Sequence, residues 1–163
     1  MAPTVRTRAY DVPGVIGVLN EILKMELATV VYYTHYSFMV YGHARIPVID
    51  WMRKQATESL VHAQGAGDMI LRLEGRPDMG IAPLPKTHHS TIDQILNEAV
   101  DREAEGVDLY RKLHAMIKDK SIVLEEYASR MVAAESMHVS EMRMMLRRSA
   151  PENEPSAPRL TQT

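Results

Sequence analysis

The sequence predicts an all-α fold, a four-helix bundle with one long crossover between its second and third helices. Two observations predict it. Apolar residues recur at helical spacing in four long segments, and these segments are separated by two short links and one long, proline-containing connection. Short links join antiparallel neighbours, whereas a long connection runs along a bundle and leaves the two helices that it joins parallel. With 163 residues, the chain is long enough for one domain with a buried core.

The first helix is expected over residues 13–41 and the second over residues 47–74. Each opens on a proline, which is favoured in the first helical turn because the N–H that it lacks would have no partner there. Gly42 follows the first helix, and Gly-Arg-Pro at 75–77 follows the second. Because the link between these helices is short, we expect them to be antiparallel neighbours.

The third helix is expected over residues 91–118 and the fourth over residues 121–148. The third opens on a capping box, in which Thr91 accepts a hydrogen bond from a free backbone N–H and Gln94 reaches back toward it. The fourth follows after another short link, so these two helices are also expected to be antiparallel neighbours.

The connection between the second and third helices spans residues 76–90 and contains three prolines. It is too long for a turn between neighbours and has the length of a crossover, which predicts an up-down-down-up bundle. We therefore expect residues 1–148 to form the bundle. Residues 149–163 are rich in proline and lack an apolar face, so they are expected to form a tail.

Composition excludes several classes of function. The formal net charge is −2 and the isoelectric point is about 6.4, so nothing calls for a nucleic acid or an anionic membrane as partner. The absence of cysteine excludes disulfides, thiolate metal sites and thioether-linked haem, and it suits a reducing cytosol. No stretch has the character of a signal peptide or a membrane span. We therefore expect a cytoplasmic protein.

The two halves of the chain carry similar patterns of glutamate, tyrosine and histidine. In each half a glutamate is followed seven residues later by a tyrosine and then, on the next helix, by a histidine: Glu26, Tyr33 and His62 in the first half, and Glu103, Tyr110 and His138 in the second. His138 also closes a Glu-x-x-His pattern that begins at Glu135, and residues three apart lie on one face of a helix.

This pattern predicts a metal site in the bundle core. One glutamate from each of two helices, with Glu-x-x-His from each of the other two, is the ligand set of di-metal carboxylate bundles. Buried carboxylates are costly unless they are paired or bind metal, and carboxylates with imidazole suit Fe(II), Mn(II) and Zn(II). The expected ligands are Glu26, His62, Glu103, Glu135 and His138, with Glu103 or Glu135 bridging. Tyr33 and Tyr110 are expected to hydrogen-bond across to the carboxylates as outer partners.

The first half departs from this pattern at Ser59, where a Glu-x-x-His ending at His62 would carry its glutamate. Glu58 is adjacent but points about 100° away from that position on an ideal helix. A π-bulge would bring Glu58 and His62 onto one face, and Gln55 is a second candidate substitute. Because one anion is lost, we expect an asymmetric site, in which the metal near the second-half ligands is held more tightly than the metal near Glu26 and His62.

Five segments, which together span all four helices, also resemble a known family: residues 19–27, 58–63, 73–77, 103–110 and 135–138. They are similar to the bacterioferritins and the wider ferritin-like superfamily. The resemblance implies an intrasubunit di-iron ferroxidase centre, iron storage and assembly into a hollow shell.

Two further departures from the family concern haem and assembly. The family's haem-ligating methionine falls at Leu60, so the resemblance implies no haem at that residue. The short fifth helix of bacterioferritins is replaced by the tail at 149–163. This implies either a shell of different size, closer to the smaller ferritin-like cages, or no shell.

Three functions are compatible with these residues. The favoured one is iron storage, with oxidation of Fe(II) by O2 or peroxide. The second, supported mainly by Ser59, is a non-catalytic shell subunit that co-assembles with an active partner subunit. The third is a di-iron oxidase or oxygenase acting on an organic substrate, which needs an apolar channel. The small residues at 65–67 permit either such a channel or close helix packing.

Overall fold

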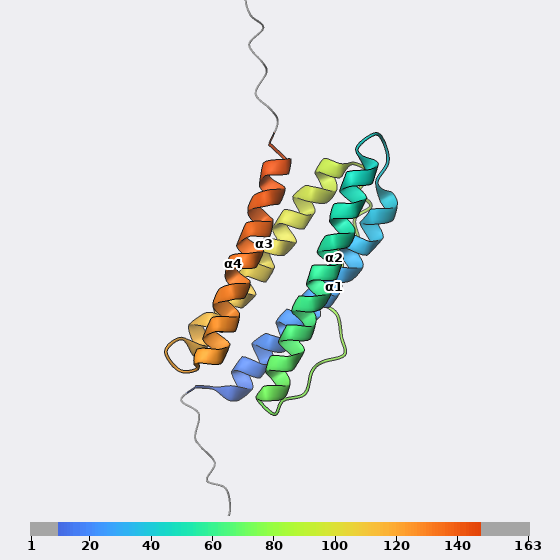
Figure 1. Ribbon diagram of the computed structural model, residues 1–163. Coiled ribbons are helices and arrows are strands. Elements are labelled where there is room, and N and C mark those ends of the chain that lie inside the picture. The colour runs from blue at the N-terminus through green and yellow to red at the C-terminus, as the bar shows by residue number, and fades with distance from the viewer. Residues whose placement is uncertain (1–9, 148–163) are drawn as a thin grey trace, which may run out of the picture.

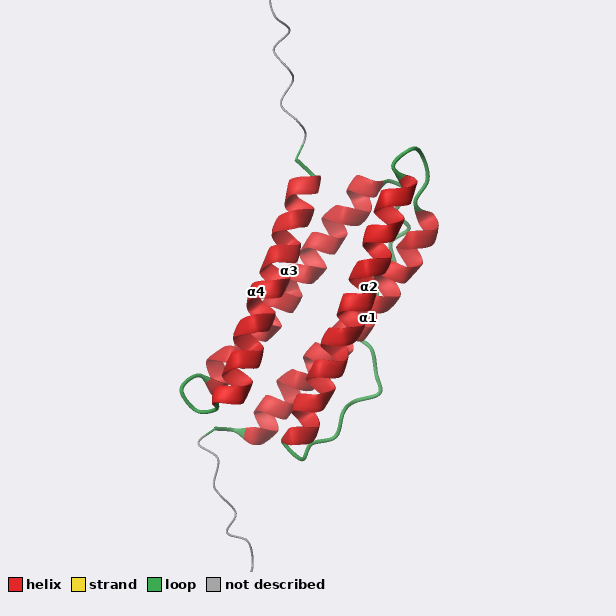
Figure 2. Cartoon of the chain, viewed as in Figure 1, coloured by secondary structure: helices red, strands yellow, loops and turns green. Residues whose placement is uncertain are grey.

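The computed structural model describes residues 10–147 and shows four helices and no strands in that range (Figures 1 and 2). The all-α prediction is confirmed, and the helix ends differ from the expected ones by a few residues. The tail expected at 149–163 lies outside the described residues. The helices are α1 (Val12–Met39), α2 (Arg45–Arg72), α3 (Ile92–Ile117) and α4 (Ile122–Met145).

The bundle has the expected up-down-down-up order, because α2 and α3 run in the same direction (Figure 1). The connection between them follows α1 from its first half toward its end. Its hydrogen bonds reach successively later residues of α1: Asp78 N–H donates to Asn20 Oδ1 at 2.7 Å, Ala82 N–H to Lys24 O at 2.9 Å, and Tyr36 OH donates to Thr87 O at 3.2 Å. The crossover is therefore bound to the bundle along its length.

Side-chain caps begin three of the four helices. Asp11 and Ser121 accept hydrogen bonds from the first turns of α1 and α4. At α3, Thr91 Oγ1 accepts from the Gln94 N–H at 3.3 Å, as the capping box predicts. Gln94 responds through its side-chain oxygen, which accepts from the Thr91 hydroxyl at 3.0 Å. These caps satisfy backbone N–H groups that a helix start leaves without partners.

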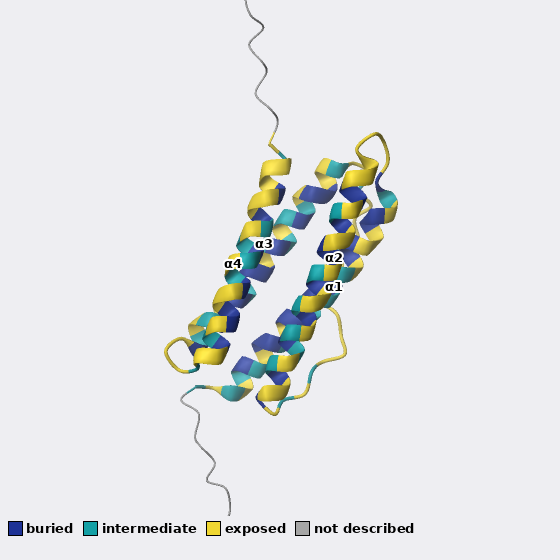
Figure 3. Ribbon diagram, viewed as in Figure 1, coloured by how far each residue is buried: buried dark blue, intermediate teal, exposed yellow. Residues whose placement is uncertain are grey.

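Two apolar clusters form the core and are separated along the bundle by a polar layer. One cluster contains Leu19 and Ile22 of α1 with Leu113 and Ile117 of α3. The other contains the end of α1 from Tyr32 onward, together with Ile95 and Leu96 of α3 and Met142 of α4. Figure 3 shows buried residues along the inward faces of the helices. Between the two clusters, each helix contributes one or two polar side chains to the interior: Glu26 of α1, Ser59 and His62 of α2, Glu103 of α3, and Glu135 and His138 of α4.

The helices do not approach one another equally. α1 packs closely on α2, α3 packs closely on α4, and α1 joins the two pairs through α3. The backbones of α2 and α4 stay further apart, so contacts between them in the polar layer are made by long side chains. None of the helices within residues 10–147 has the length and apolar character needed to cross a membrane.

Candidate metal centre

Three glutamates of the polar layer are almost fully buried. Glu26, Glu103 and Glu135 are 2%, 5% and 3% exposed, and they come from α1, α3 and α4. Each lies on the stripe of its helix that faces the two apolar clusters, so the helical period that buries its neighbours also buries the carboxylate. Burying an ionised carboxylate without a partner costs several kcal/mol or more. The layer therefore needs cations or protons.

The most compact group in the layer consists of Glu26, His62 and Glu135. His62 Nδ1 lies 2.7 Å from Glu135 Oε1 and 3.5 Å from Glu26 Oε1. One ligand atom from each of the three residues lies within 4.8 Å of the others. Glu135 Oε1 is buried and makes no hydrogen bond of good geometry within residues 10–147. A buried oxygen left in this state, beside an imidazole nitrogen and a second carboxylate, fits a cation held between them.

Glu135 also faces the second histidine. Its other oxygen, Oε2, lies 3.5 Å from His138 Nδ1. The His62 and His138 rings are nearly parallel, with an interplanar angle of 17° and centroids 6.4 Å apart. The carboxylate of Glu135 thus presents one oxygen to each imidazole, which is the arrangement of a carboxylate that bridges two cations.

Two tyrosines connect α1 and α3 through the layer. Tyr33 OH donates to Glu103 Oε1 and Tyr110 OH donates to Glu26 Oε1, each at 2.8 Å. These are the hydrogen bonds across the bundle that the sequence predicts. Tyr33 occupies one oxygen of Glu103 and leaves the other for a different partner, whereas Tyr110 binds the same Glu26 oxygen that lies 3.5 Å from His62 Nδ1.

The charges of the layer are strongly coupled. Burial raises the pKa of Glu26, and burial together with the negative charge of Glu135 raises the pKa of Glu103 to about 8. Burial alone would raise the pKa of Glu135 too, but its contacts with His138 and His62 lower it to about 2. Burial opposes protonation of His62, yet its contacts with Glu135 and Glu26 raise its pKa to about 10.

Protons therefore balance the carboxylates of the metal-free layer at neutral pH. His62 carries one of these protons, and Glu103 another. These protons offset the negative charge of the buried carboxylates, which bound metal cations would otherwise offset. Glu26 and Glu135 each lie within 3.5 Å of an imidazole nitrogen, and Glu103 is a third buried carboxylate of the same layer, so the donor set suits Fe(II). The residues present therefore fit the metal that the sequence pattern predicts.

The π-bulge by which Glu58 could join the ligands does not occur in α2. α2 is a regular α-helix from Arg45 to Arg72, and a π-bulge is not needed to bring Glu58 and His62 onto one face. Residues four apart on an α-helix differ by only about 40° in direction, so Glu58 and His62 already share a face. Ser59 is buried, with 6% of its surface exposed, and the side chain of Glu58 is 33% exposed. The two residues therefore lie on opposite sides of His62, with Glu58 toward solvent.

Glu58 contacts the outer nitrogen of a histidine. Its Oε2 lies 3.4 Å from His138 Nε2, which is on the far side of the ring from Glu135. Gln55, which the sequence offers as a substitute ligand, donates from Nε2 to the same Glu58 oxygen at 3.3 Å. Sequence reasoning missed this contact, because helical periodicity within α2 says nothing about the position of a ring on α4.

The structure gathers a different group of side chains from the one that the sequence favours. The sequence favoured the position near Glu103, Glu135 and His138, whereas the compact group is that of Glu26, His62 and Glu135. The ligands of the compact position already lie close together, so less rearrangement is needed to bring them around a metal ion.

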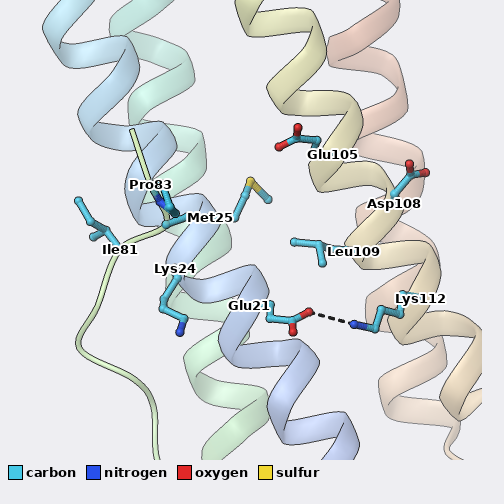
Figure 4. Close-up of a pocket in the computed structure, with 10 residues that line it drawn as sticks. Glu21, Lys24, Met25, Ile81, Pro83, Glu105, Asp108, Leu109 and Lys112 are labelled. Atoms are coloured by element: carbon cyan, nitrogen blue, oxygen red, sulfur yellow. Dashed lines mark hydrogen bonds and ion pairs between the residues drawn. The ribbon is translucent and has the colours of Figure 1, made fainter. Parts of the chain in front are cut away.

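A cavity of about 560 Å³ lies between α1, α3 and the crossover (Figure 4). Its wall combines Met25, Leu109 and Ile81 with charged groups, and the Glu21–Lys112 ion pair of 3.0 Å crosses one side. None of the five expected ligands lines it. An organic substrate would need an apolar cavity that reaches the carboxylates, so this cavity does not support the oxygenase reading.

The small residues after His62 serve packing at one position. A Cβ atom on Gly65 would lie 3.5 Å from the Tyr127 ring and 3.9 Å from its hydroxyl. Tyr127 is buried and packs against Tyr110 with ring centroids 6.2 Å apart. A Cβ atom there would make an ordinary van der Waals contact, so α2 packs against an aromatic ring of α4 at Gly65, which favours helix packing over a channel.

Haem is not expected to bind through α2. Leu60 is 42% exposed and carries no donor atom, and Met52 is fully buried in the apolar core. Protein purified from haem-supplied cells should show no strong Soret band. The variant Leu60→Met restores a thioether at an exposed position and serves as the comparison. A strong Soret band in the unaltered protein would show that another residue binds haem.

Comparisons with known proteins support a single family. The model of the ferritin-like domain family matches residues 16–150, which includes every residue of the polar layer. No curated protein matches the chain.

Several solved structures have the same fold and share about a quarter or less of their residues with this chain. A ferritin-like diiron-carboxylate protein from Bacillus anthracis is 24% identical, with a TM-score of 0.78 over 85% of this chain and 99% of its own. A dodecameric thioferritin, the bacterioferritin-related protein of Bacteroides fragilis, is 24% identical with a TM-score of 0.77, covering 84% and 86%. The bacterioferritin of Rhodobacter capsulatus is 21% identical with a TM-score of 0.73, covering 82% and 84%. With its four-helix crossover bundle and the matched family model, this chain belongs to the ferritin-like family.

Proposed function

We propose that this protein binds iron between its four helices, oxidises Fe(II) there with O2 or peroxide, and sequesters the product in an assembly of its own copies. The observation that carries the proposal is the buried Glu135 carboxylate, which directs one oxygen to His62 and the other to His138. Family membership and the buried glutamates of α1 and α3 support it.

The residues divide into two iron positions that share Glu135. Glu26 and His62 serve the first, and Glu103 and His138 serve the second. Oxidation of two Fe(II) ions releases two electrons, which with two protons convert one O2 to hydrogen peroxide. The buried layer holds both ions near each other, and the two tyrosine hydrogen bonds hold the carboxylates of α1 and α3 in place. Binding of the ions displaces protons from the imidazole and carboxylate ligands.

Oxygen consumption after addition of Fe(II) tests this function. We expect the unaltered protein to consume O2 and Ser59→Glu to consume it several-fold faster, because the new carboxylate adds an anionic ligand. Ser59→Ala is the matched control and should behave like the unaltered protein. If only Ser59→Glu consumes O2, the natural chain is the non-catalytic shell subunit that its serine suggests, and an active partner subunit supplies oxidation.

Metal titration without oxygen tests the asymmetry. We expect one tight and one weak equivalent of Fe(II) per chain. Glu26→Gln should remove the tight equivalent and Glu103→Gln the weak one, because each substitution exchanges a charged ligand for a neutral amide of the same shape. The compact geometry of the first position predicts this order. The reverse assignment would favour the order that the sequence alone suggests.

Assembly is supported by apolar side chains that remain on the surface of one chain. Val31 and Phe38 of α1, Leu71 of α2, and Met79 and Ile81 of the crossover are all exposed. Exposed apolar groups of this number favour contact with other chains. The related thioferritin of Bacteroides fragilis is dodecameric. We propose a closed homo-oligomeric shell, whose size native mass spectrometry would measure.

A further inference from the structure

We propose that Glu58 is a positioning residue of the metal centre, whose carboxylate holds the His138 ring with Nδ1 toward the second metal position. The inference rests on the proposed function, because it concerns the same pair of iron positions. It differs from the expectation that Glu58 replaces the missing ligand at position 59. In the structure Glu58 acts through a histidine and lies outside the layer.

The two nitrogens of His138 face two different carboxylates. Nδ1 lies 3.5 Å from Glu135 Oε2, inside the layer, and Nε2 lies 3.4 Å from Glu58 Oε2, toward solvent. A neutral imidazole carries its proton on one nitrogen and binds a metal through the other. When Nδ1, which points toward the shared carboxylate, binds a metal, the proton is on Nε2, which faces Glu58 Oε2. A carboxylate on the outer nitrogen fixes the tautomer and the ring orientation of a metal-binding histidine.

Glu58 is itself held by residues of α2. Gln55 donates from Nε2 to Glu58 Oε2 at 3.3 Å, and Lys54 Nζ lies 3.4 Å from Glu58 Oε1. Gln55 is buried, whereas Lys54 is exposed, so the stronger restraint on Glu58 comes from the amide. Both carboxylate oxygens are therefore occupied from one helix, and the group is oriented before any metal binds.

The position of Glu58 also explains how the layer accommodates a serine at position 59. Ser59 is buried beside His62 and contributes no charge, whereas Glu58 lies on the solvent side of the same helix face. The family pattern places a glutamate among the ligands at position 59. Here a negative charge is supplied instead by Glu58, on the outer side of the His138 ring. The second metal position therefore keeps Glu103 and the shared Glu135 and has a more basic and better oriented imidazole.

The test is a titration with Co(II) under anaerobic conditions, which reports each equivalent through visible absorption. Glu58→Ala should weaken one equivalent by about 10- to 100-fold, the usual cost of losing an outer partner. Glu58→Gln should stay close to the unaltered protein, because its amide oxygen still accepts the Nε2 proton. Asp68→Asn removes one exposed carboxylate from the same helix and should change nothing.

A second readout needs no metal. Diethylpyrocarbonate modifies free imidazole nitrogens, and peptide mass spectrometry measures the rate at His138. Glu58→Ala should speed this modification, because Nε2 loses its partner, whereas Glu58→Gln should not. The rate at His114, far along α3, is the internal control.

The outcomes separate the inference from the proposed function. Equal loss of Co(II) in Glu58→Gln and Glu58→Ala would show that the anion itself binds the metal and would overturn the positioning role. Unchanged affinity and unchanged modification in both variants would overturn it as well. If the unaltered protein binds no Co(II), the proposed function fails, and the modification rates alone then decide whether Glu58 positions His138.

Discussion

Replacing Glu135 with alanine is expected to abolish both metal positions, the largest loss of any single substitution in the polar layer. The reason is geometric, since one oxygen of Glu135 faces His62 and the other faces His138. The loss should exceed the roughly 10- to 100-fold that removal of an outer partner costs. Anaerobic Co(II) titration measures it directly, and oxidation of Fe(II) should fall with it.

The controls for this substitution come from the same helix. Glu141→Ala removes an exposed carboxylate from α4 and should bind metal as the unaltered protein does. Glu135→Gln preserves side-chain volume, so a loss of binding in both Glu135 variants cannot be a loss of packing. Circular dichroism confirms that the helices persist. A Glu135→Ala protein that keeps one tight equivalent would show that Glu135 serves a single position and does not bridge.

Glu103→Gln is expected to make the metal-free protein more stable above neutral pH while weakening its metal binding. Burial and the charge of Glu135 raise the pKa of Glu103 to about 8, from 4.5 in an unfolded chain. The glutamine keeps an oxygen that accepts the Tyr33 hydroxyl proton, and it needs no proton to be neutral. The gain in the free energy of unfolding at pH 8.5 should be of the order of a few kcal/mol.

The pH dependence of this gain follows from proton linkage. An unfolded chain releases the Glu103 proton near pH 4.5, whereas the folded chain keeps it until about pH 8. Folding must therefore take up a proton between these values, and the free energy of unfolding falls as pH rises through that window. Glu103→Gln removes this part of the decline. The gain should be small at pH 5 and constant above about pH 8.

Urea unfolding of the metal-free protein at pH 5, 6.5 and 8.5, with chelator and equal protein concentrations, measures the difference. Glu105→Gln is the matched control, because it removes an exposed carboxylate two residues away on α3. His62 has a raised pKa as well, but its contribution is common to both proteins and cancels in the comparison. A Glu103→Gln protein less stable than the unaltered one at pH 8.5 would mean that the buried carboxylate is not a source of strain. In that case stability would explain the presence of the carboxylate at position 103, and no functional explanation would be needed.

The fold was accessible from sequence because its signals are local. The prolines that open two helices, the Thr91 cap and the long connection after α2 together predict four helices and their directions. Hydrogen bonds of Asp78 and Ala82 to α1 confirm the crossover. The same helical period indicates that Glu26, Glu103 and Glu135 point inward, and all three are buried.

The pairing of side chains across helices was less accessible. Periodicity gives the direction of a side chain around its own helix axis, but not the offset and rotation of one helix against another. The compact group of Glu26, His62 and Glu135 depends on those offsets, and so helical periodicity could not show which side chains gather most closely. The π-bulge considered for Glu58 is not needed, because the four-residue spacing to His62 already places both on one face.

The sequence by itself determined the helices, their order and the identity of the residues that carry charge into the core, because these follow from local spacing and from the cost of burying a carboxylate. Only the tertiary structure decided which oxygen meets which nitrogen. In the tertiary structure Glu135 contacts both His62 and His138, and Glu58 lies beside the outer nitrogen of His138. Contacts of this kind depend on where α4 lies relative to α2, since long side chains reach between them and bring together residues about eighty positions apart in the chain.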